Sequence, residues 1–296
     1  MNGLPSAREG HVFTVDVEEY FQVSAFEGAV SRREWDGLPS RVEANVELLL
    51  GVLAEYGVHA TFFTLGWIAE KHPTVVRRIA AAGHEVASHG WWHRRLTGME
   101  SEEFRLEIRR TKQILEGLAG RPVYGHRAPS FSVVPGTEWA FDILLEEGYR
   151  YDSSVFPIRR LGYGYPGAEP GPHVVTRPGG RLLELPLATT RWAGLRLPAA
   201  GGAYFRVLPF GLTRRAFAEH TREGRCGVFY LHPWELDPDQ PRLRVSPLAR
   251  GRHYLGLAGT LRRLHLLLGR FRFTSVERRF GLGEVGAAAR VSAPLG

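Results

Sequence analysis

The sequence contains very little cysteine and very little lysine. Cys226 is the only cysteine among 296 residues, so no disulfide can form within the chain, which fits a reducing compartment. Lys71 and Lys112 are the only lysines among 38 basic residues, so arginine supplies most of the net charge of +7. The positive residues are scattered and form no block, and we therefore expect no nucleic-acid partner.

Long apolar runs are also absent. No stretch approaches the ~18 apolar residues of a membrane-spanning helix, so we expect no transmembrane segment. The N-terminal stretch MNGLPSAREGH lacks the apolar centre of a signal peptide, which favours a cytoplasmic location, near the inner membrane face if the substrate is a lipid-linked precursor. Hydrophobic residues make up 44% and charged residues 23% of the chain, as in ordinary soluble proteins. We find no internal repeat and no linker, and expect one domain over residues 1–296.

The first half of the chain alternates between short apolar runs typical of buried strands and longer runs with helical periodicity. The strand-like runs are 12–17, 60–65, 84–88, 123–127 and 149–155. The helical runs are 42–53, a run from about 73 to 83, 104–118 and 139–145. Such alternation predicts an α/β fold, with a parallel sheet or barrel and helices on its outside.

The second half of the chain is less regular. Residues 157–180 are rich in glycine, proline and arginine and indicate a long surface excursion. Further strands are expected at 182–187, 203–208, 227–231 and 271–276. Further helices are expected at 212–222 and 253–268.

Two histidines four residues apart stand out in the stretch SHGWWH, which follows the strand-like run 84–88. On a helical turn, residues i and i+4 share one face, so His89 and His93 can reach one metal ion. The alternative is a pair of surface histidines beside Trp91 and Trp92, and the pair alone does not decide between them.

Polar side chains end several other strand-like runs. Asp16 and Glu18 end the first, Arg127 ends the fourth, Asp152 lies in the fifth, and His232 ends a late one. In (β/α) barrels the active site lies at the carboxyl ends of the strands, so these side chains are expected to converge. Two histidines and a carboxylate form a catalytic zinc-type site, a second carboxylate can serve as a base, and a separate histidine as an acid.

The series TVDVE, SHGWWH, HRAPS, YDSS and YLHP resembles, in order and spacing, the motifs of the polysaccharide deacetylases of carbohydrate esterase family four. The resemblance implies a metal-dependent N-deacetylase on an irregular, NodB-like (β/α) barrel of seven strands. GGAYFRVLP and HPWELDPDQPR, in a family-specific part at about 157–280, resemble one subgroup. That subgroup is found with bacterial exopolysaccharide synthesis and exosortase (PEP-CTERM) systems.

The resemblance implies a role for each matching residue. The expected metal ligands are His89 and His93, the general base is Asp16, and the general acid is His232. Arg127 would hold Asp16, and Asp152 would support His232. The substrate-binding residues expected at the site are Pro129, Ser130, Trp92, Leu231 and Trp234, with Leu231 lining the acyl pocket.

The chain departs from the family pattern in two places. Val17 stands where the family has a second aspartate that binds the metal, and Ser130 stands where it has a tyrosine. Because residues i and i+2 of a strand face the same way, we predict Glu18 as the third ligand beside the base Asp16. The alternative is that Glu18 faces solvent and either Glu19 or Asp16 takes the ligand place.

The leading hypothesis is therefore hydrolysis of N-acetyl groups on amino sugars of a polysaccharide or its precursor. Alternatives within the enzyme class are a peptidoglycan deacetylase and an allantoinase-like hydrolase of small cyclic amides. A third alternative is a carbohydrate-binding protein without catalysis. The expected cofactor is one divalent metal ion, with zinc first and cobalt, nickel or manganese as alternatives. The expected partner is an N-acetylated glycan, and the sequence does not indicate an oligomeric state.

Overall fold

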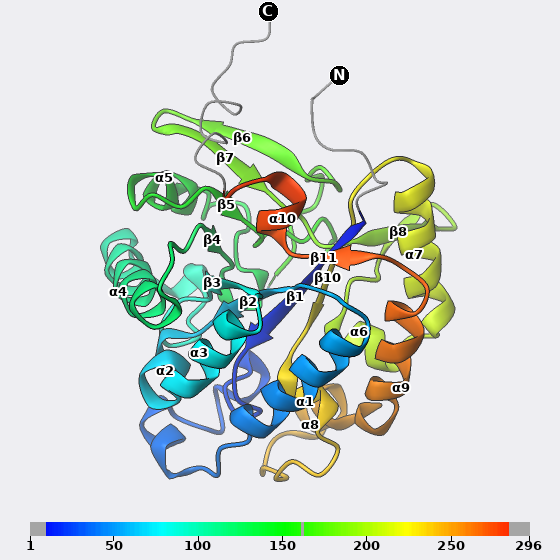
Figure 1. Ribbon diagram of the computed structural model, residues 1–296, viewed down its shortest axis with the longest axis horizontal. Coiled ribbons are helices and arrows are strands. Elements are labelled where there is room, and N and C mark those ends of the chain that lie inside the picture. Colours follow the sequence, from blue (N-terminus) through cyan, green and yellow to red (C-terminus); the bar gives the residue numbers. More distant parts are fainter. Residues whose placement is uncertain (1–9, 161–162, 284–296) are drawn as a thin grey trace, which may run out of the picture.

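A computed structural model describes residues 10–160 and 163–283 of the chain. The first nine residues, on which the expectation about a targeting signal mainly rests, lie outside this range. A curled sheet occupies the centre, and helices pack around its outside (Figure 1). Within the described residues, no helix combines the length and the apolar character that a bilayer span requires.

The strands are mostly short, and the first five lie at the five strand-like runs predicted for the first half of the chain. They are β1 (His11–Val17), β2 (Thr61–Thr64), β3 (Glu85–Ser88), β4 (Gly125–His126), β5 (Tyr151–Asp152), β6 (His173–Arg177), β7 (Gly180–Glu184), β8 (Thr189–Trp192), β9 (Leu195–Pro198), β10 (Val228–Leu231) and β11 (Phe273–Thr274).

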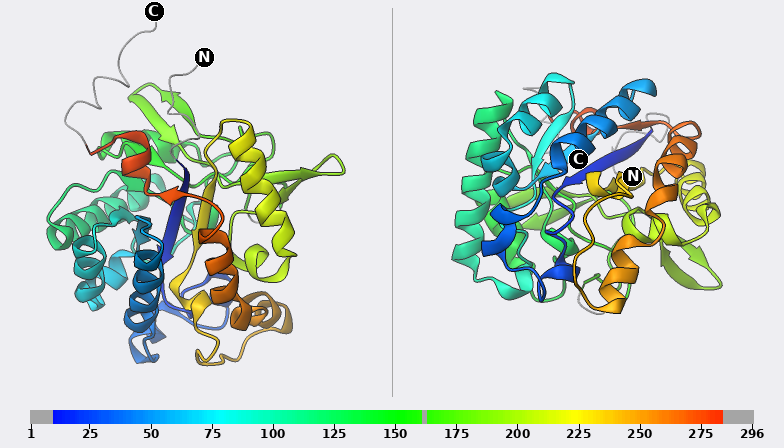
Figure 2. Two further views of the ribbon diagram at one scale, coloured as in Figure 1. Left: turned by 45° about the vertical axis from the view of Figure 1, so that its right-hand side comes forward. Right: turned by 90° about the horizontal axis from the view of Figure 1, so that it is seen from below.

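The helices follow the strands and cover the outer face of the sheet. They are α1 (Val42–Glu55), α2 (Gly66–Lys71), α3 (Pro73–Ala81), α4 (Ser101–Ala119), α5 (Trp139–Glu146), α6 (Gly202–Val207), α7 (Phe210–Arg222), α8 (Pro247–Tyr254), α9 (Leu257–Leu268) and α10 (Val276–Phe280). Figure 2 shows α1 to α4 along one part of the curled sheet and α7 and α9 along another part.

The main sheet is an irregular barrel. Its neighbours run in the order β10-β1-β2-β3-β4-β5-β7, and all of these pairs are parallel. The sheet curls until Leu187, just after β7, forms a bridge with Val228 in β10, and Gly201 forms a second bridge with Tyr230. β6 adds antiparallel to β7, β11 pairs with the start of β1, and β8 and β9 form a separate hairpin. The predicted α/β barrel fold is therefore confirmed.

β1 crosses the centre of the molecule, and all seven of its residues are buried. Its neighbours on both sides are parallel strands, and its residues are buried on both faces, as is usual for parallel sheets. On α1 the buried residues Val42, Val46, Leu49 and Leu53 recur at helical spacing and face the sheet. Burial of these apolar faces fixes β1 in place and so fixes the polar residues at its end.

Two sequence predictions of secondary structure are wrong, and glycines explain both. Residues 203–208 were expected as a strand but form most of α6, which starts where Gly202 takes φ +57 against the ring of Tyr230. Residues 253–268 were expected as one helix. Gly256, at φ +79, separates α8 from α9, and its backbone lies against the carbonyl of Arg206, where a Cβ would not fit.

The segment expected as a surface excursion, residues 157–180, also contains regular structure. Within it, β6 starts at His173 and pairs antiparallel with β7, which begins at Gly180. The hairpin that joins these strands is tight, because Arg177 lies opposite Gly180. Alternation is weak here because β6 is only half-buried, so its polar and apolar residues do not separate clearly by face.

Candidate active site

The histidine pair lies at the carboxyl end of β3, as predicted, but in a loop instead of a helix. Gly90 at φ +73 and His93 at φ +51 turn this loop back on itself. The two imidazole rings consequently lie 5.4 Å apart, edge to face. His89 Nδ1 lies 2.8 Å from the carbonyl oxygen of Arg127, which only accepts, so Nδ1 carries the hydrogen and Nε2 keeps its lone pair.

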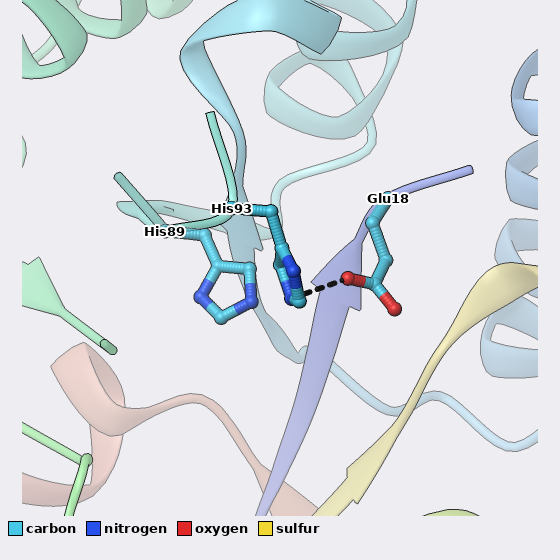
Figure 3. A group of neighbouring side chains, drawn as sticks. All are labelled: Glu18, His89 and His93. Atoms are coloured by element: carbon cyan, nitrogen blue, oxygen red, sulfur yellow. Dashed lines mark ion pairs between the residues drawn. The ribbon is translucent and has the colours of Figure 1, made fainter. Parts of the chain in front are cut away.

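Glu18 completes a group of three candidate metal ligands, shown in Figure 3. It follows β1 directly, and its Oε2 lies 2.8 Å from His93 Nε2. One nitrogen of each histidine and one oxygen of Glu18 all lie within 4.8 Å of one another, and all three residues are buried. Two imidazoles and one carboxylate form the usual donor set of a catalytic zinc site, so these residues fit a divalent metal.

The pKa values of Glu18 and His89 suit that role. Burial raises the pKa of Glu18, but the nearby His93 and His232 outweigh it and lower the value to about 2. Burial lowers the pKa of His89 to about 4. Glu18 is therefore a carboxylate and His89 a neutral imidazole near pH 7, which are the forms that bind metals.

Asp16 points to the same side as Glu18, as the alternation along the strand predicts. His232 Nε2 lies 3.9 Å from Asp16 Oδ2 and 3.5 Å from Glu18 Oε1. Val17, between the two acids, is fully buried in the apolar core. Both carboxylates therefore face one space, and the sheet places them there.

Arg127 holds Asp16 in a fixed position, as predicted. Its Nη1 lies 2.6 Å from Asp16 Oδ1 and 2.8 Å from the hydroxyl of Thr14. Its Nε and Nη2 donate to the carbonyl and the hydroxyl of Ser153. Arg127 is fully buried, and its guanidinium lies over the ring of Phe63. A buried charge is tolerated only when it is paired and hydrogen-bonded in this way.

Glu19, the alternative third ligand, instead forms hydrogen bonds at the start of α1. Its carboxylate accepts hydrogen bonds from the hydroxyl of Ser40 and from the backbone N–H groups of Arg41 and Val42. These groups form the start of α1, where backbone N–H groups have no partner within the helix. Glu19 is thus occupied at the helix N-terminus and lies outside the group of Glu18, His89 and His93.

The predicted contact between Asp152 and His232 is wrong. Asp152 instead pairs with His126, whose Nδ1 lies 2.8 Å from its Oδ1, and it also binds Ser154. The register of the sheet gives the reason. Asp152 lies opposite His126 in the sheet, so it shares the face of His126, and the next residue, Arg127, faces the site. Asp152 therefore packs on the helix side and supports the segment after β4 indirectly.

His232 has Glu235 as its partner, and the sequence reasoning missed this residue. Glu235 Oε1 lies 2.7 Å from His232 Nδ1, and Glu235 also accepts from the backbone N–H of His232. Arg206 Nε lies 2.6 Å from Glu235 Oε2, so the carboxylate is itself paired. The signal in the sequence was HPWE, in which the histidine precedes a single helical turn and the glutamate is the third residue of that turn.

These contacts set the protonation of His232. Burial lowers its pKa, but the charge of Glu18 and the hydrogen bond to Glu235 outweigh burial and raise the value to about 9. His232 therefore carries a proton on both nitrogens near pH 7. Its Nδ1–H donates to Glu235, and its Nε2–H points toward the two acids at the end of β1.

A cavity of about 480 Å³ opens over these residues, a volume within the usual range for ligand sites. Asp16, Glu18, His93 and His232 line one part of it. The rest of the lining is rich in aromatic and cationic side chains.

Two of the five expected substrate-binding residues, Ser130 and Trp234, line this cavity. Ser130 has φ +57, and its hydroxyl lies 2.5 Å from that of Ser24. Trp234 is mostly buried, stacks on His232 and donates from its indole N–H to Glu18. Trp234 thus helps to fix the ligand Glu18 as well as lining the wall.

The other three expected substrate-binding residues, Trp92, Pro129 and Leu231, are not part of the cavity lining. Trp92 is half-buried and packs against Trp35, and Pro129 is buried at the start of a short turn. Tyr230 takes the place expected for Leu231. Leu231 lies opposite the outward-facing Val15, whereas Tyr230 lies opposite Thr14, which contacts Arg127.

Comparison with known families matches the chain in two parts. Residues 34–141 match the family described as polysaccharide deacetylase, and residues 153–281 match a domain of unknown function, DUF3473. A peptidoglycan-N-acetylglucosamine deacetylase of Bacillus cereus is 34% identical over 149 residues, which cover 45% of this chain and 52% of that protein. Together these matches show that part of the chain is similar to polysaccharide deacetylases.

A second curated deacetylase is also similar to part of this chain. A chitooligosaccharide deacetylase of Rhizobium leguminosarum bv. trifolii is 48% identical over 67 residues, which cover 23% of this chain and 31% of that protein. The chain thus spans about half the length of the first curated relative and about a third of the second.

Two solved structures share the fold over nearly the whole chain. A protein of Mycobacterium smegmatis, provisionally named a polysaccharide deacetylase, has a TM-score of 0.60 at 22% identity, covering 97% of this chain and 94% of its own. Puue allantoinase also has a TM-score of 0.60, at 18% identity, covering 99% of this chain and 96% of its own. At these identities the likeness establishes the barrel fold.

The candidate active site contains residues from both matched ranges. His89, His93 and Arg127 belong to the first matched range, and His232 and Glu235 to the second. β10, from the second range, pairs directly with β1 and so places His232 beside Asp16 and Glu18.

Proposed function

We propose that the protein is a metal-dependent hydrolase that removes N-acetyl groups from amino sugars of a polysaccharide or of its precursor. One observation carries this proposal. Glu18 and His93 of the buried ligand group line a cavity together with Asp16, a carboxylate held by arginine, and His232, a protonated imidazole. Amide hydrolysis needs a base, an acid and stabilisation of charge on the carbonyl oxygen, and this arrangement offers groups for each.

The metal we propose is a single zinc ion bound by Glu18, His89 and His93, with cobalt, nickel or manganese as alternatives. When bound, such a metal supplies Lewis acidity, which polarises a carbonyl group and makes water more acidic. The hydrogen bond from His89 to the Arg127 carbonyl fixes the ring orientation that binding requires.

The side chains of the protein divide the proton transfers. Asp16 accepts a proton from the attacking water, and Arg127 holds its carboxylate in place at the site. Water adds to the amide carbon, and the C–N bond then breaks. His232 donates its Nε2 proton to the leaving nitrogen, so the products are a free amino sugar and acetate. Glu235 holds the imidazolium in the orientation that this donation needs.

The substrate class rests on the relatives. The curated relatives are named as deacetylases of peptidoglycan and of chitooligosaccharide, which supports an N-acetylated glycan as the substrate of this chain. We propose an exopolysaccharide or its lipid-linked precursor, with peptidoglycan as the alternative that the B. cereus relative favours. A cytoplasmic site of action near the inner membrane face, and a single domain over residues 1–296, are further parts of this proposal.

Release of acetate tests the proposal. Purified protein is stripped of metal, reloaded with zinc, cobalt, nickel or manganese, and incubated with N-acetylated oligosaccharides and with peptidoglycan fragments. We expect acetate from at least one glycan, at a rate that depends on the metal. The matched control is the His232→Ala variant, which should keep its metal and release acetate about 10²–10⁴ times more slowly. Equal rates with and without His232 would contradict the proposed chemistry.

A further inference from the structure

Four arginines line the active-site cavity, and two of them are engaged elsewhere. Arg206 pairs with Glu235 and donates to backbone carbonyl groups. Arg95 lies 3.4 Å from the carboxylate of Glu27. Their charges are therefore compensated, and they serve to shape the site.

Arg160 and Arg252 are the other two arginines of the cavity, and their contacts differ from those of Arg206 and Arg95. Both are exposed, and within the described residues neither forms an ion pair with a carboxylate. Their guanidinium carbons lie 5.9 and 5.8 Å from the centre of the Tyr163 ring. Arg160 also lies 5.4 Å from the ring centre of Tyr204. The contacts with tyrosine rings hold the two cations beside the cavity without neutralising them.

The tyrosines join this cluster to the wall of the cavity. The hydroxyl groups of Tyr163 and Tyr204 lie 2.5 Å apart, so the two rings form one unit. Tyr163 is itself part of the cavity lining, with Arg160 and Arg252. A ligand that extends from the catalytic residues along this wall would therefore meet two uncompensated positive charges.

The charges of the cavity are thus separated. The carboxylates of Asp16 and Glu18 belong to the catalytic part, and the free guanidinium groups belong to the part around Tyr163. Arg127 and His232 compensate the two acids, whereas no carboxylate of the described residues compensates the arginines around Tyr163, so an anionic group of a ligand is attracted to that part of the cavity. Guanidinium groups also match carboxylate and phosphate geometry, because they donate two parallel hydrogen bonds.

We propose that Arg160, Arg252 and Tyr163 form a subsite for an anionic group, a carboxylate or a phosphate, on the glycan that the enzyme deacetylates. The subsite binds this group while the N-acetyl group of another part of the glycan reaches Asp16 and His232. This inference rests on the proposed deacetylase function and narrows its substrate class to acidic glycans or phosphate-linked precursors.

Three N-acetylated oligosaccharides of equal length test the subsite kinetically: one neutral, one with a uronate residue, and one with a phosphate at its reducing end. For the wild-type enzyme we expect a KM at least about tenfold lower for one or both charged substrates than for the neutral one. In the Arg160→Gln/Arg252→Gln double variant this preference should fall by about tenfold or more. A preference for only one of the two charged substrates identifies the anion as a carboxylate or a phosphate, and a preference for both shows that the subsite accepts either.

A control variant distinguishes an effect of the subsite on KM from an effect of the overall surface charge. Arg214 on α7 is exposed and outside the cavity lining, so Arg214→Gln removes one positive charge elsewhere. It should leave the preference for the charged substrate unchanged. Equal KM values for charged and neutral substrates in the wild type, or an undiminished preference in the double variant, would overturn the subsite.

A binding measurement separates this inference from the proposed function. Calorimetry on the full chain with the same oligosaccharides requires no turnover. Tighter binding of a charged oligosaccharide that the double variant loses supports the subsite, even if no acetate is released and the proposed function fails. Release of acetate together with equal binding of charged and neutral oligosaccharides rejects the subsite and leaves the deacetylase function intact.

Discussion

Glu235 Oε1 lies 2.7 Å from Nδ1 of His232, and both side chains are held by the single helical turn that follows β10. Glu235 lies on the Nδ1 side of the imidazole, and the oxygens of Asp16 and Glu18 approach Nε2 on its other side. One nitrogen is thus fixed by a buried carboxylate, and the other is available to the cavity. This relationship determines both the orientation and the protonation of His232.

The first prediction concerns this pair. The charge of Glu18 and the hydrogen bond to Glu235 outweigh burial and raise the pKa of His232 to about 9. A general acid works only when protonated, so activity should be lost as the pH rises through this value. Glu235→Gln removes one stabilising charge and lowers the pKa of His232, so the alkaline limb of the kcat profile should move to lower pH. The measurement is kcat from pH 6 to 10.

Asp152→Asn is the comparison variant for that profile. Asp152 pairs with His126 and not with His232. The alkaline limb of the kcat profile of Asp152→Asn should therefore stay where it is in the wild type. A shift in Asp152→Asn with none in Glu235→Gln would restore the pairing that the sequence suggested.

The second prediction separates Asp16 from Glu18. Asp16 contacts Arg127 and lies outside the ligand group, so Asp16→Asn should retain the metal while kcat falls by about 10²–10⁴-fold. Glu18 belongs to the ligand group, so Glu18→Gln should weaken metal binding, with activity partly restored by excess metal. Metal content and kcat are measured on both variants. Loss of metal from Asp16→Asn alone would reverse the two assignments.

The third prediction concerns metal removal. A chelator should abolish activity and lower the melting temperature, because a ligand that binds only the folded state stabilises it. Adding zinc should restore both, and the bound metal should approach one ion per chain. His89→Ala removes one of the two imidazole ligands and should lose this response. Elemental analysis and thermal unfolding provide the readouts, and metal content in His89→Ala equal to that of the wild type would exclude the site.

The fourth prediction concerns stability at a buried acid outside the cavity. Burial raises the pKa of Glu85 to about 7, although Thr61, Tyr151 and the N–H of Glu277 donate hydrogen bonds to its carboxyl group. Its folded pKa lies above its unfolded pKa of 4.5. The folded state therefore holds the proton more tightly, and stability is lost as the pH rises from about 4.5 through 7.

Glu85→Gln tests this, because glutamine resembles the protonated carboxyl group. Between pH 5 and 8 the wild type should lose on the order of 2–3 kcal/mol of unfolding free energy relative to this variant. Urea unfolding at both pH values measures the difference. Glu47→Gln, at an exposed position on α1, should show no comparable change. Parallel pH dependence of Glu85→Gln and the wild type would show that Glu85 is already ionised in the folded state.

The sequence by itself determined the barrel and much of the site. Apolar runs alternating with helical periodicity predict a parallel sheet, and such a sheet brings the carboxyl ends of its strands to one edge. The positions of Asp16, Glu18 and Arg127 follow from this, because each stands at or just after the end of a strand. The two-residue period of a strand also predicts that both acids face the site while Val17 does not.

Only the tertiary structure decided which polar groups pair. Asp152 lies in a strand of two residues, too short for its facing side to be read from alternation, and the sheet register turns it toward His126. Tyr230 replaces Leu231 at the cavity for a similar reason, since the register with β1 decides which of two adjacent apolar residues faces inward.

The structure also decided contacts between residues that are far apart in the chain or held by loops. Arg206 reaches Glu235 because α6 begins at a glycine that tolerates a positive φ next to β10. The histidine pair meets through a loop whose turn depends on the left-handed conformations of Gly90 and His93. The spacing of residues along the sequence does not predict such contacts, because they depend on how separate elements pack against one another.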